Sequence, residues 1–170
     1  MAKAKEEDSV VMFDRDILKD IDFSKGECRL HKRGLSIDNP GDNLLLRPLC
    51  SDDYEKERFH AMKSCPGTYY IIVVEDTELA KIVACGTLFI EQKFIHEIAI
   101  RGRVEDIVVD DSCRGRGLGK LVVETLLLLS EKLGCYKTSL ECKDPLLPFY
   151  SQFGFKKEDQ QNYLCKRFFH

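Results

Sequence analysis

One short stretch of the chain combines residue types that bind anions. Two valines and two aspartates at positions 108–111 end an apolar segment, and a helix-forming segment begins at about residue 118. Between them stand three alternate glycines, Gly115, Gly117 and Gly119, and three cations, Arg114, Arg116 and Lys120. Glycine permits positive φ and a close approach of backbone to ligand. Amides at the start of a helix point outward together, so this corner suits a phosphate or diphosphate.

The spacing of this corner excludes two common nucleotide motifs. A P-loop ends in Gly-Lys-Ser/Thr, but Leu121 follows Lys120. A dinucleotide fingerprint starting at Gly115 would need glycine at position 120. The pattern Arg-x-x-Gly-x-Gly resembles instead the pyrophosphate loop of the GNAT acetyltransferase superfamily, which binds acetyl-coenzyme A. The alternative without a ligand is a glycine-rich turn that only joins a strand to a helix. The resemblance implies these diphosphate-binding residues: Arg114, Gly115, Arg116, Gly117, Leu118, Gly119 and Lys120.

Several further stretches, in order, narrow the resemblance. They are KFIH at 93–96, RGRVEDI at 101–107, GCYK at 134–137, LEC at 140–142 and FYxxFGF at 149–155. Over roughly residues 44–167 the chain resembles the glucosamine-6-phosphate N-acetyltransferase family. The resemblance implies transfer of an acetyl group from acetyl-CoA to the amine of D-glucosamine 6-phosphate, by direct attack in a ternary complex. The product would feed UDP-N-acetylglucosamine biosynthesis, and the enzyme would be a homodimer with its sites at the subunit boundary.

The resemblance also implies individual roles. Tyr150 would donate a proton to the departing thiolate and contact the cosubstrate, and Glu141 would orient the amine or help to accept its proton. The backbone of Ile107, Val108 and Val109 would pair with the pantetheine arm and polarise the thioester carbonyl. The sugar-phosphate site would be lined by Lys93, Phe94, Ile95, His96, Glu105, Asp106, Ile107, Tyr136 and Lys137, with Arg167 at the phosphate.

Residue types alone leave other interpretations open. Glu105 and Asp106 are unusual inside an apolar strand, and adjacent strand residues face opposite sides, so at most one shares a face with the neighbours of Glu141. A buried carboxylate there needs a partner, either a substrate or a salt bridge to Arg101 or Arg103. Taken alone, a tyrosine such as the one at 150 is more often a core aromatic than an acid.

The chain departs from the family pattern in three places. The segment between Pro48 and Thr68 is short, so the family's substrate-contacting threonine has no clear counterpart. The family's asparagine before the Phe-Tyr helix falls on Leu146, and position 141 is Glu where some members carry Asp. Cys142 follows on the strand beside the expected thioester, which leaves open a mixed disulfide with free coenzyme A.

The elements that must position these residues follow from periodicity and turn signals. Alternating and β-branched runs predict strands at 44–48, 68–75, 81–91, 103–109 and 136–142, a short one from Phe155 and a last one at 163–169. Helical spacing and stop signals predict helices at 54–63, 118–133 and 145–153. This order indicates an α/β fold with a mixed twisted sheet flanked by helices on both faces, as in the GNAT acyltransferase fold.

The length of the chain limits the number of domains it can form. The chain has 170 residues, which fits one domain, placed here at 43–170. Residues 1–42 form a partly ordered N-terminal appendage with one helix-spaced apolar patch, at Phe13, Ile17, Leu18 and Ile21. That patch could dock on the domain or on a partner chain, and a loosely attached tail is the alternative.

Net charge, hydrophobicity and cysteine spacing argue against several classes of protein. The net charge of −3 argues against a dedicated nucleic-acid binder, and no apolar run is long enough to span a membrane. The charged start of the chain predicts no secretory signal. The eight cysteines show neither CxxC nor metal-ligand spacing, which indicates reduced thiols, a cytoplasmic protein and no metal.

Two other functions remain as hypotheses. A GNAT enzyme that acetylates a protein or polyamine would want an acidic groove rather than the cations Lys93, Lys137 and Arg167. A non-catalytic acyl-coenzyme A sensor would bind the cosubstrate and show no acceptor-dependent thiol release, and it would have no use for Tyr150 and Glu141.

Overall fold

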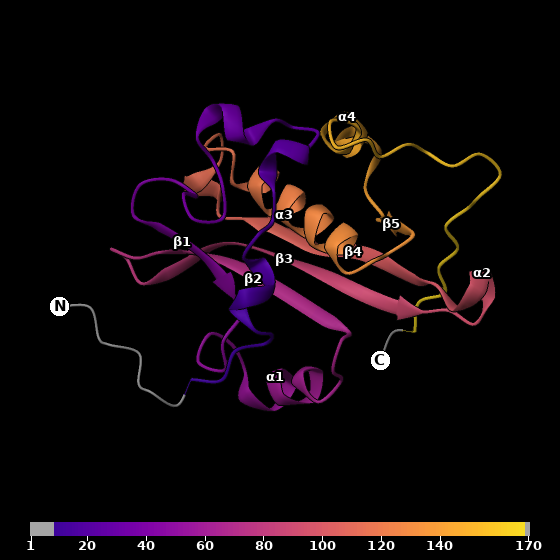
Figure 1. Cartoon of the computed structure of the whole chain (residues 1–170), viewed down its shortest axis with the longest axis horizontal. Helices are drawn as coiled ribbons and strands as arrows, with labels where there is room; N and C mark the ends of the chain where they lie inside the picture. The colour runs from indigo at the N-terminus through magenta and orange to yellow at the C-terminus, as the bar shows by residue number, and fades with distance from the viewer. Residues whose placement is uncertain (1–8, 169–170) are drawn as a thin grey trace.

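A five-stranded sheet forms the centre of the computed structural model, which describes residues 9–168 apart from the side chains of Ile95 and His96. Within the described residues the strands are β1 (Leu44–Pro48), β2 (Tyr69–Asp76), β3 (Lys81–Gln92), β4 (Ile100–Val109) and β5 (Lys137–Ser139). They are ordered β1-β2-β3-β4-β5 across the sheet (Figure 1). The first four run antiparallel, and β5 joins β4 in parallel.

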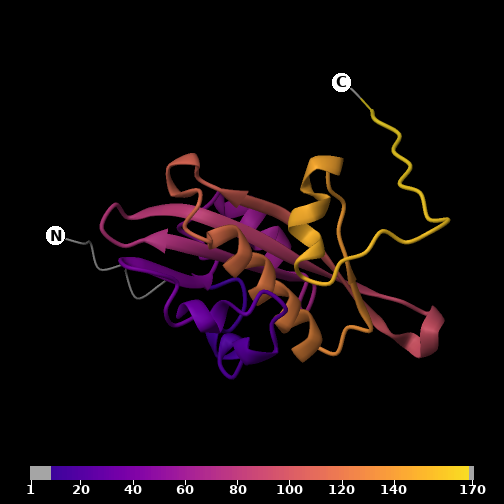
Figure 2. The same cartoon turned by 90° about the horizontal axis from the view of Figure 1, so that it is seen from above.

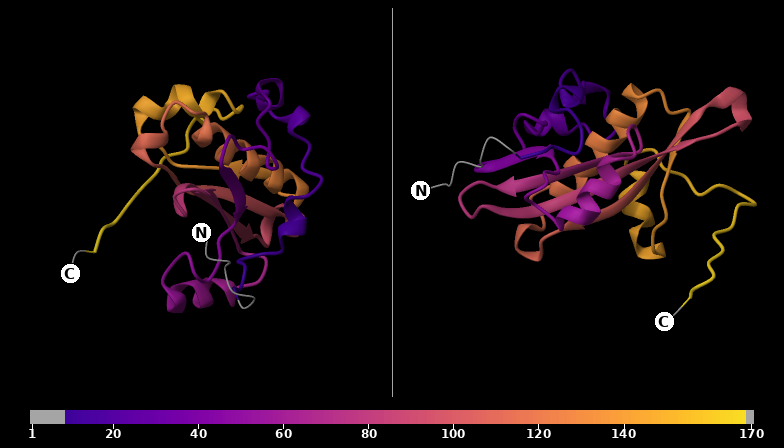
Figure 3. Two further views of the ribbon diagram at one scale, coloured as in Figure 1. Left: turned by 90° about the vertical axis from the view of Figure 1, so that its left-hand side faces the viewer. Right: turned by 90° about the horizontal axis from the view of Figure 1, so that it is seen from below.

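Helices cover both faces of this sheet. They are α1 (Lys56–Lys63), α2 (Ile95–Ile98), α3 (Leu118–Lys132) and α4 (Leu147–Ser151). The helices α3 and α4 lie on one face and α1 on the other, while α2 caps the protruding hairpin of β3 and β4 (Figures 1 and 3). The mixed sheet with helices on both faces confirms the expected α/β fold.

The helix α3 supplies most of the core on its face. Its apolar residues occur nearly all around the helix, as expected for a buried element. Leu121, Leu126 and Leu129 are fully buried. The sheet allows a close approach at Gly102, where a Cβ atom would lie 2.5 Å from the Ser130 hydroxyl of α3. This contact identifies the face of β4 that α3 covers, and the side chains next to Gly102 point to the opposite face.

The N-terminal segment packs on the same side of the sheet as α3. Short 3₁₀ helices (Arg15–Leu18, Phe23–Lys25, Leu30–Arg33) replace the single helix that the apolar spacing suggested. Phe13 and Leu18 are buried in the main core, so the patch docks on its own chain.

A buried carboxylate anchors this segment to α3. Glu124 of α3 is almost fully buried, and its Oε1 accepts a hydrogen bond from the backbone amide of Cys28 at 2.9 Å. Gly26 passes so close that a Cβ atom would lie 2.2 Å from the same oxygen. The contact joins residues almost a hundred positions apart in the sequence, which is why no local pattern indicated it.

The strands expected near the C-terminus are not formed in the described residues. No strand begins at Phe155, and residues 163–168 are exposed and irregular. The β5 strand is also shorter than the predicted range 136–142. Figure 2 shows this C-terminal segment leaving the body beyond α4. A strand needs a paired neighbour for its backbone groups, and the segment lies beside none among residues 9–168.

All eight cysteines are free thiols, so the structure contains no disulfide bond between them. In the part of the chain that the structure describes, no helix has the length and hydrophobicity needed to cross a membrane.

Candidate active site

The glycine corner lies at the start of α3. Gly115 and Gly117 have φ angles of 80° and 88°, in the region that favours glycine, and Gly117 is the N-cap of the helix. A Cβ atom on Gly119 would lie 3.5 Å from Val109 and 3.7 Å from Phe149, so β4 and α4 both meet α3 here. The first amides of a helix have no intrahelical acceptor. The corner therefore offers backbone donors to an anion, as the sequence predicts.

The three cations around this corner contact partners at the exposed surface. These pairs are Arg114 with Asp111 at 2.6 Å, Arg116 with the carbonyl oxygen of Asp42 at 3.5 Å and Lys120 with the side-chain oxygen of Gln152. The Arg114 pair is exposed, and such surface pairs contribute little to stability. A bound phosphate could therefore replace these partners at small cost.

The outer edge of β4 is open next to the corner. β5 pairs with β4 only at Arg101–Arg103, and beyond this range no strand of the described residues occupies that edge. The pairing with β3 shifts register near Cys85, where Asp106 has a φ of 54°. Such a bulge bends a strand. Val108 is 57% exposed at this edge. The backbone of 107–109 thus presents a short edge to an extended ligand.

Tyr150 of α4 faces this same region. It is 9% exposed and packs in a small cluster that includes Ile107 of β4 and Cys142 beyond β5. Its ring lies 5.0 Å from that of Phe149. Burial raises the pKa of Tyr150, and the nearby thiol of Cys142 adds to the shift. The hydroxyl is therefore protonated at neutral pH, which suits a proton donor. The ring also packs in the hydrophobic cluster.

The acidic residues gather around one arginine. Arg103 Nη2 donates to Glu141 Oε1 at 2.8 Å, and Arg103 Nε donates to Glu105 Oε1 at 3.2 Å. Glu91 approaches Arg103 Nη1 at 3.6 Å. Burial lowers the pKa of Arg103, but the hydrogen bond to Glu141 and the charges of Glu105 and Glu91 outweigh it and raise that pKa. The side chain therefore carries a permanent positive charge between these carboxylates.

The carboxylates at 105 and 106 are exposed in this chain, not buried as the strand pattern suggested. Glu105 shares the sheet face of Arg103 and forms the salt bridge that was the simpler alternative. Asp106 occupies the bulge, which interrupts the strict alternation of side chains.

A second charged group extends along β3. Glu91 pairs with Lys93 and lies 3.8 Å from Arg101. Burial acts to raise the pKa of Glu91, but Lys93, Arg101 and Arg103 outweigh it, so the pKa lies below its ordinary value. The side chains of the two strands therefore form a band of charge on the face away from α3.

The remaining residues predicted to contact the sugar phosphate are more dispersed. Phe94 is 98% exposed beside α2, and Tyr136 is exposed just before β5. Lys137 lies 3.6 Å from Glu158. The side chains of Ile95 and His96 fall outside the described residues. Residues 93–96 project at the hairpin tip, so this chain alone does not surround the predicted acceptor site with them (Figure 2).

Arg167 lies on the exposed C-terminal segment. The pKa of Tyr163, on the same segment, is raised by a hydrogen bond with Cys165 and by the charge of Glu141, and it is lowered in part by Arg167. The part of the segment around Tyr163 therefore passes within electrostatic range of Glu141.

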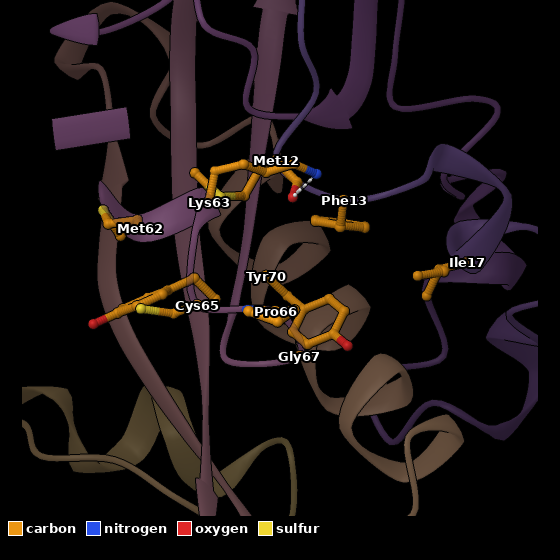
Figure 4. Close-up of a pocket in the computed structure, with 10 residues that line it drawn as sticks. Met12, Phe13, Ile17, Met62, Lys63, Cys65, Pro66, Gly67 and Tyr70 are labelled. Atoms are coloured by element: carbon orange, nitrogen blue, oxygen red, sulfur yellow. Dashed lines mark hydrogen bonds between the residues drawn. The ribbon is translucent and has the colours of Figure 1, made fainter. Parts of the chain in front are cut away.

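A separate cavity lies elsewhere, between the N-terminal segment, α1 and β2. It has a volume of about 260 Å³ and is lined mainly by apolar and aromatic side chains, among them Phe13 and Tyr70 (Figure 4). Lys63 Nζ donates to the backbone carbonyl of Met12 at 3.0 Å across its wall. None of the residues predicted for catalysis or binding lines this cavity.

Sequence reasoning placed Arg103 only as a salt-bridge alternative and did not consider Glu91. Charged residues at the alternate positions 101, 103 and 105 of one strand (Arg, Arg and Glu) could have indicated a charged face. The support of the glycine corner by the N-terminal segment was also missed. A Cβ atom on Gly117 would lie 3.3 Å from Leu35, so this segment packs against the corner.

Comparisons with known proteins agree with this geometry. The sequence model described as the acetyltransferase (GNAT) family matches residues 42–155. A probable glucosamine 6-phosphate N-acetyltransferase of Drosophila melanogaster is 40% identical over 166 residues, which cover 85% of this chain and 75% of that protein. Glucosamine 6-phosphate N-acetyltransferase 1 of Dictyostelium discoideum is 36% identical and spans 71% of this chain and 89% of its own length.

A solved structure is similar as well. The crystal structure of glucosamine-6-phosphate N-acetyltransferase from Arabidopsis thaliana superposes with a TM-score of 0.69 at 30% sequence identity. The alignment covers 75% of this chain and 99% of that one.

Proposed function

The chain belongs to the acetyltransferase (GNAT) family and, within it, to the glucosamine 6-phosphate N-acetyltransferases, and from this premise we propose that it transfers the acetyl group of acetyl-CoA to the amine of D-glucosamine 6-phosphate. The observation that carries the proposal is the open edge of β4. This edge runs from the carboxylates held by Arg103 to the glycine corner at the start of α3. One end suits an amino sugar, and the other suits a diphosphate.

The residues of the corner fit the cosubstrate. The amides that open α3, with Arg114, Arg116 and Lys120 around them, would hold the diphosphate. The backbone of Ile107 to Val109 would pair with the pantetheine arm along the open edge of β4. When bound there, acetyl-CoA supplies the acetyl group as an activated thioester.

The residues on either side of this edge supply the proton chemistry. Glu141 receives the proton of the amine as the new C–N bond forms. Tyr150 gives its hydroxyl proton to the sulfur as the C–S bond breaks, and burial keeps that hydroxyl protonated beforehand. Both groups flank the same edge, which supports direct transfer with both substrates bound. The product, N-acetyl-D-glucosamine 6-phosphate, would serve UDP-N-acetylglucosamine biosynthesis in the cytoplasm, as the family resemblance implies.

The acceptor end is incomplete in one chain, and we propose that a homodimer completes it. The C-terminal segment carries Tyr163, Leu164 and Phe168, all exposed, and Leu164 is 89% exposed. Exposed apolar side chains on an unpaired segment are typical of an interaction surface. The same segment carries Arg167, the predicted phosphate ligand, so association would bring a cation to the acceptor site.

The decisive assay for this function measures thiol release from acetyl-CoA. We expect saturable release with glucosamine 6-phosphate, much weaker release with glucosamine and none above background with lysine peptides. Equal rates with lysine peptides would instead favour a protein acetyltransferase. Binding of acetyl-CoA without release in the presence of any amine would favour an acyl-coenzyme A sensor.

A matched pair of variants tests the dimer. Light scattering after size exclusion should report a dimer for the wild type and a monomer for Leu164→Asp, because a charge there opposes apolar contact. Leu79→Asp, at a leucine that is 71% exposed in the turn between β2 and β3, should remain a dimer. A monomeric wild type would contradict the proposal.

A further inference from the structure

A single guanidinium connects three carboxylates that come from different parts of the chain. Arg103 of β4 contacts Glu91 of β3, Glu105 of its own strand and Glu141 beyond β5. The shortest contact, 2.8 Å, joins Nη2 to Glu141. Nε and Nη2 thus bond to different acceptors, a geometry that the planar fork of arginine permits.

Arg103 also marks the place where the sheet opens. It is the last residue of β4 that pairs with β5, opposite Ser139. Beyond this pair the two segments separate, and Glu141 lies past the end of β5 while Glu105 continues along β4. The guanidinium therefore bridges the two sides of the opening at the end where the amine would arrive.

Resting on the function proposed above, we propose that Arg103 is a positioning residue for acetyl transfer. It holds the carboxylates of Glu141 and Glu105 on the two sides of the opening between β4 and β5, so that Glu141 meets the amine of the sugar and Glu105 meets its hydroxyl groups.

Electrostatics explains why such a residue is needed. Carboxylates gathered in a small region repel one another, and the side chains of Glu105 and Glu141, each 46% exposed, have room to turn toward solvent. Charge-assisted hydrogen bonds from a fixed guanidinium overcome this repulsion and restrict the rotamers. Glu91 is less exposed and approaches Arg103 from β3, so it helps to hold the guanidinium in place.

The neighbouring Arg101 provides a matched control. It lies two residues earlier on the same face of β4, and its guanidinium donates to Ser139 Oγ at 2.6 Å. Its contact with Glu91 is longer, at 3.8 Å, and no contact between its side chain and Glu141 is found in the described residues. The two arginines therefore share strand, face and charge but differ in whether they hold Glu141.

The experiment compares Arg103→Met, Arg103→Lys and Arg101→Met in the full chain by steady-state thiol release with acetyl-CoA and glucosamine 6-phosphate. We expect Arg103→Met to lower kcat by about 30-fold while KM for acetyl-CoA changes less than about twofold. Arg103→Lys should recover part of kcat, because lysine restores the charge without the fork. Arg101→Met should change kcat by less than about threefold.

A double-mutant cycle separates positioning from a general structural role. If Arg103 acts mainly through Glu141, Arg103→Met should lower kcat much less in the Glu141→Gln background than in the wild type, because only the contact with Glu105 is then left to lose. Fully additive losses, or an unchanged kcat in Arg103→Met, would overturn the proposal. Failure of the proposed function itself has a different signature, since the wild type would then release no thiol with glucosamine 6-phosphate.

Discussion

The two ends of the open β4 edge are built by different means. The glycine corner is made of backbone: positive φ angles, the first amides of α3 and a close approach of β4 and α4. The acceptor end is made of side chains: the carboxylates around Arg103, the hairpin tip near Phe94 and the exposed C-terminal segment. The first end is assembled within one chain, whereas the second has exposed parts, which the proposed homodimer would cover.

This difference has a physical reason. A diphosphate is held well by rigid amides, which lose no side-chain entropy on binding. An amino sugar must be distinguished from other amines through its hydroxyl, phosphate and ammonium groups, so its site needs charged side chains at several positions. Changes at the corner should therefore alter affinity for acetyl-CoA, and changes at the acceptor end should alter turnover or acceptor choice.

The largest effect is expected where the two ends meet, at Tyr150. Tyr150→Phe keeps the ring in its buried cluster and removes the proton donor, so kcat should fall by about 100-fold. The Kd for acetyl-CoA, measured by calorimetry, should stay within about threefold. Tyr54→Phe, at an exposed tyrosine before α1, serves as the control. Full turnover in Tyr150→Phe would exclude the acid role.

A smaller effect is expected at the corner itself. Gly117→Ala places a Cβ atom on a residue with a φ of 88°, which strains the backbone, and 3.3 Å from the Leu35 side chain, which must move slightly. We expect the Kd for acetyl-CoA to rise about 10-fold. Gly134→Ala has a similar φ of 81° and no atom within 4 Å of the added Cβ, so it isolates backbone strain from ligand contact. Equal Kd values in both variants would argue against a backbone cradle.

The smallest effect concerns the N-terminal segment that supports the corner. Burial raises the pKa of Glu124, although the amide of Cys28 lowers it in part. A carboxyl whose pKa is raised in the folded state stabilises the fold at low pH and loses this contribution as pH rises through that pKa. As pH rises from 4 to 7, Glu124→Gln should therefore gain stability relative to the wild type. Urea unfolding across this range tests it, and a stability difference that does not vary with pH would contradict it.

The contrast between the two ends also explains what could be predicted from the sequence. The corner was predictable because Gly115, Gly117 and Gly119 are local and only a few backbone geometries need alternating glycines. The sheet and α3 followed from periodicity in the same way. Local patterns could not indicate the hydrogen bond of Cys28 to Glu124 or the salt bridge of Arg103 to Glu141, because the members of each pair are far apart in the sequence.

The predicted C-terminal strand shows a second limit of prediction from sequence. Residues 163–168 have the composition of a strand, but a strand forms only where a neighbour pairs with it. Composition reports the preference of the segment and says nothing about where that neighbour is. The proposed homodimer would supply one.

Hydrogen–deuterium exchange with acetyl-CoA, alone and then with glucosamine 6-phosphate, tests the division into two ends most directly. Acetyl-CoA alone should slow exchange at the amides of 107–109 and 115–120. Addition of the sugar phosphate should extend protection to 93–96 and 136–137. Unchanged exchange at 115–120 under saturating acetyl-CoA would contradict the proposal that this glycine corner holds the diphosphate.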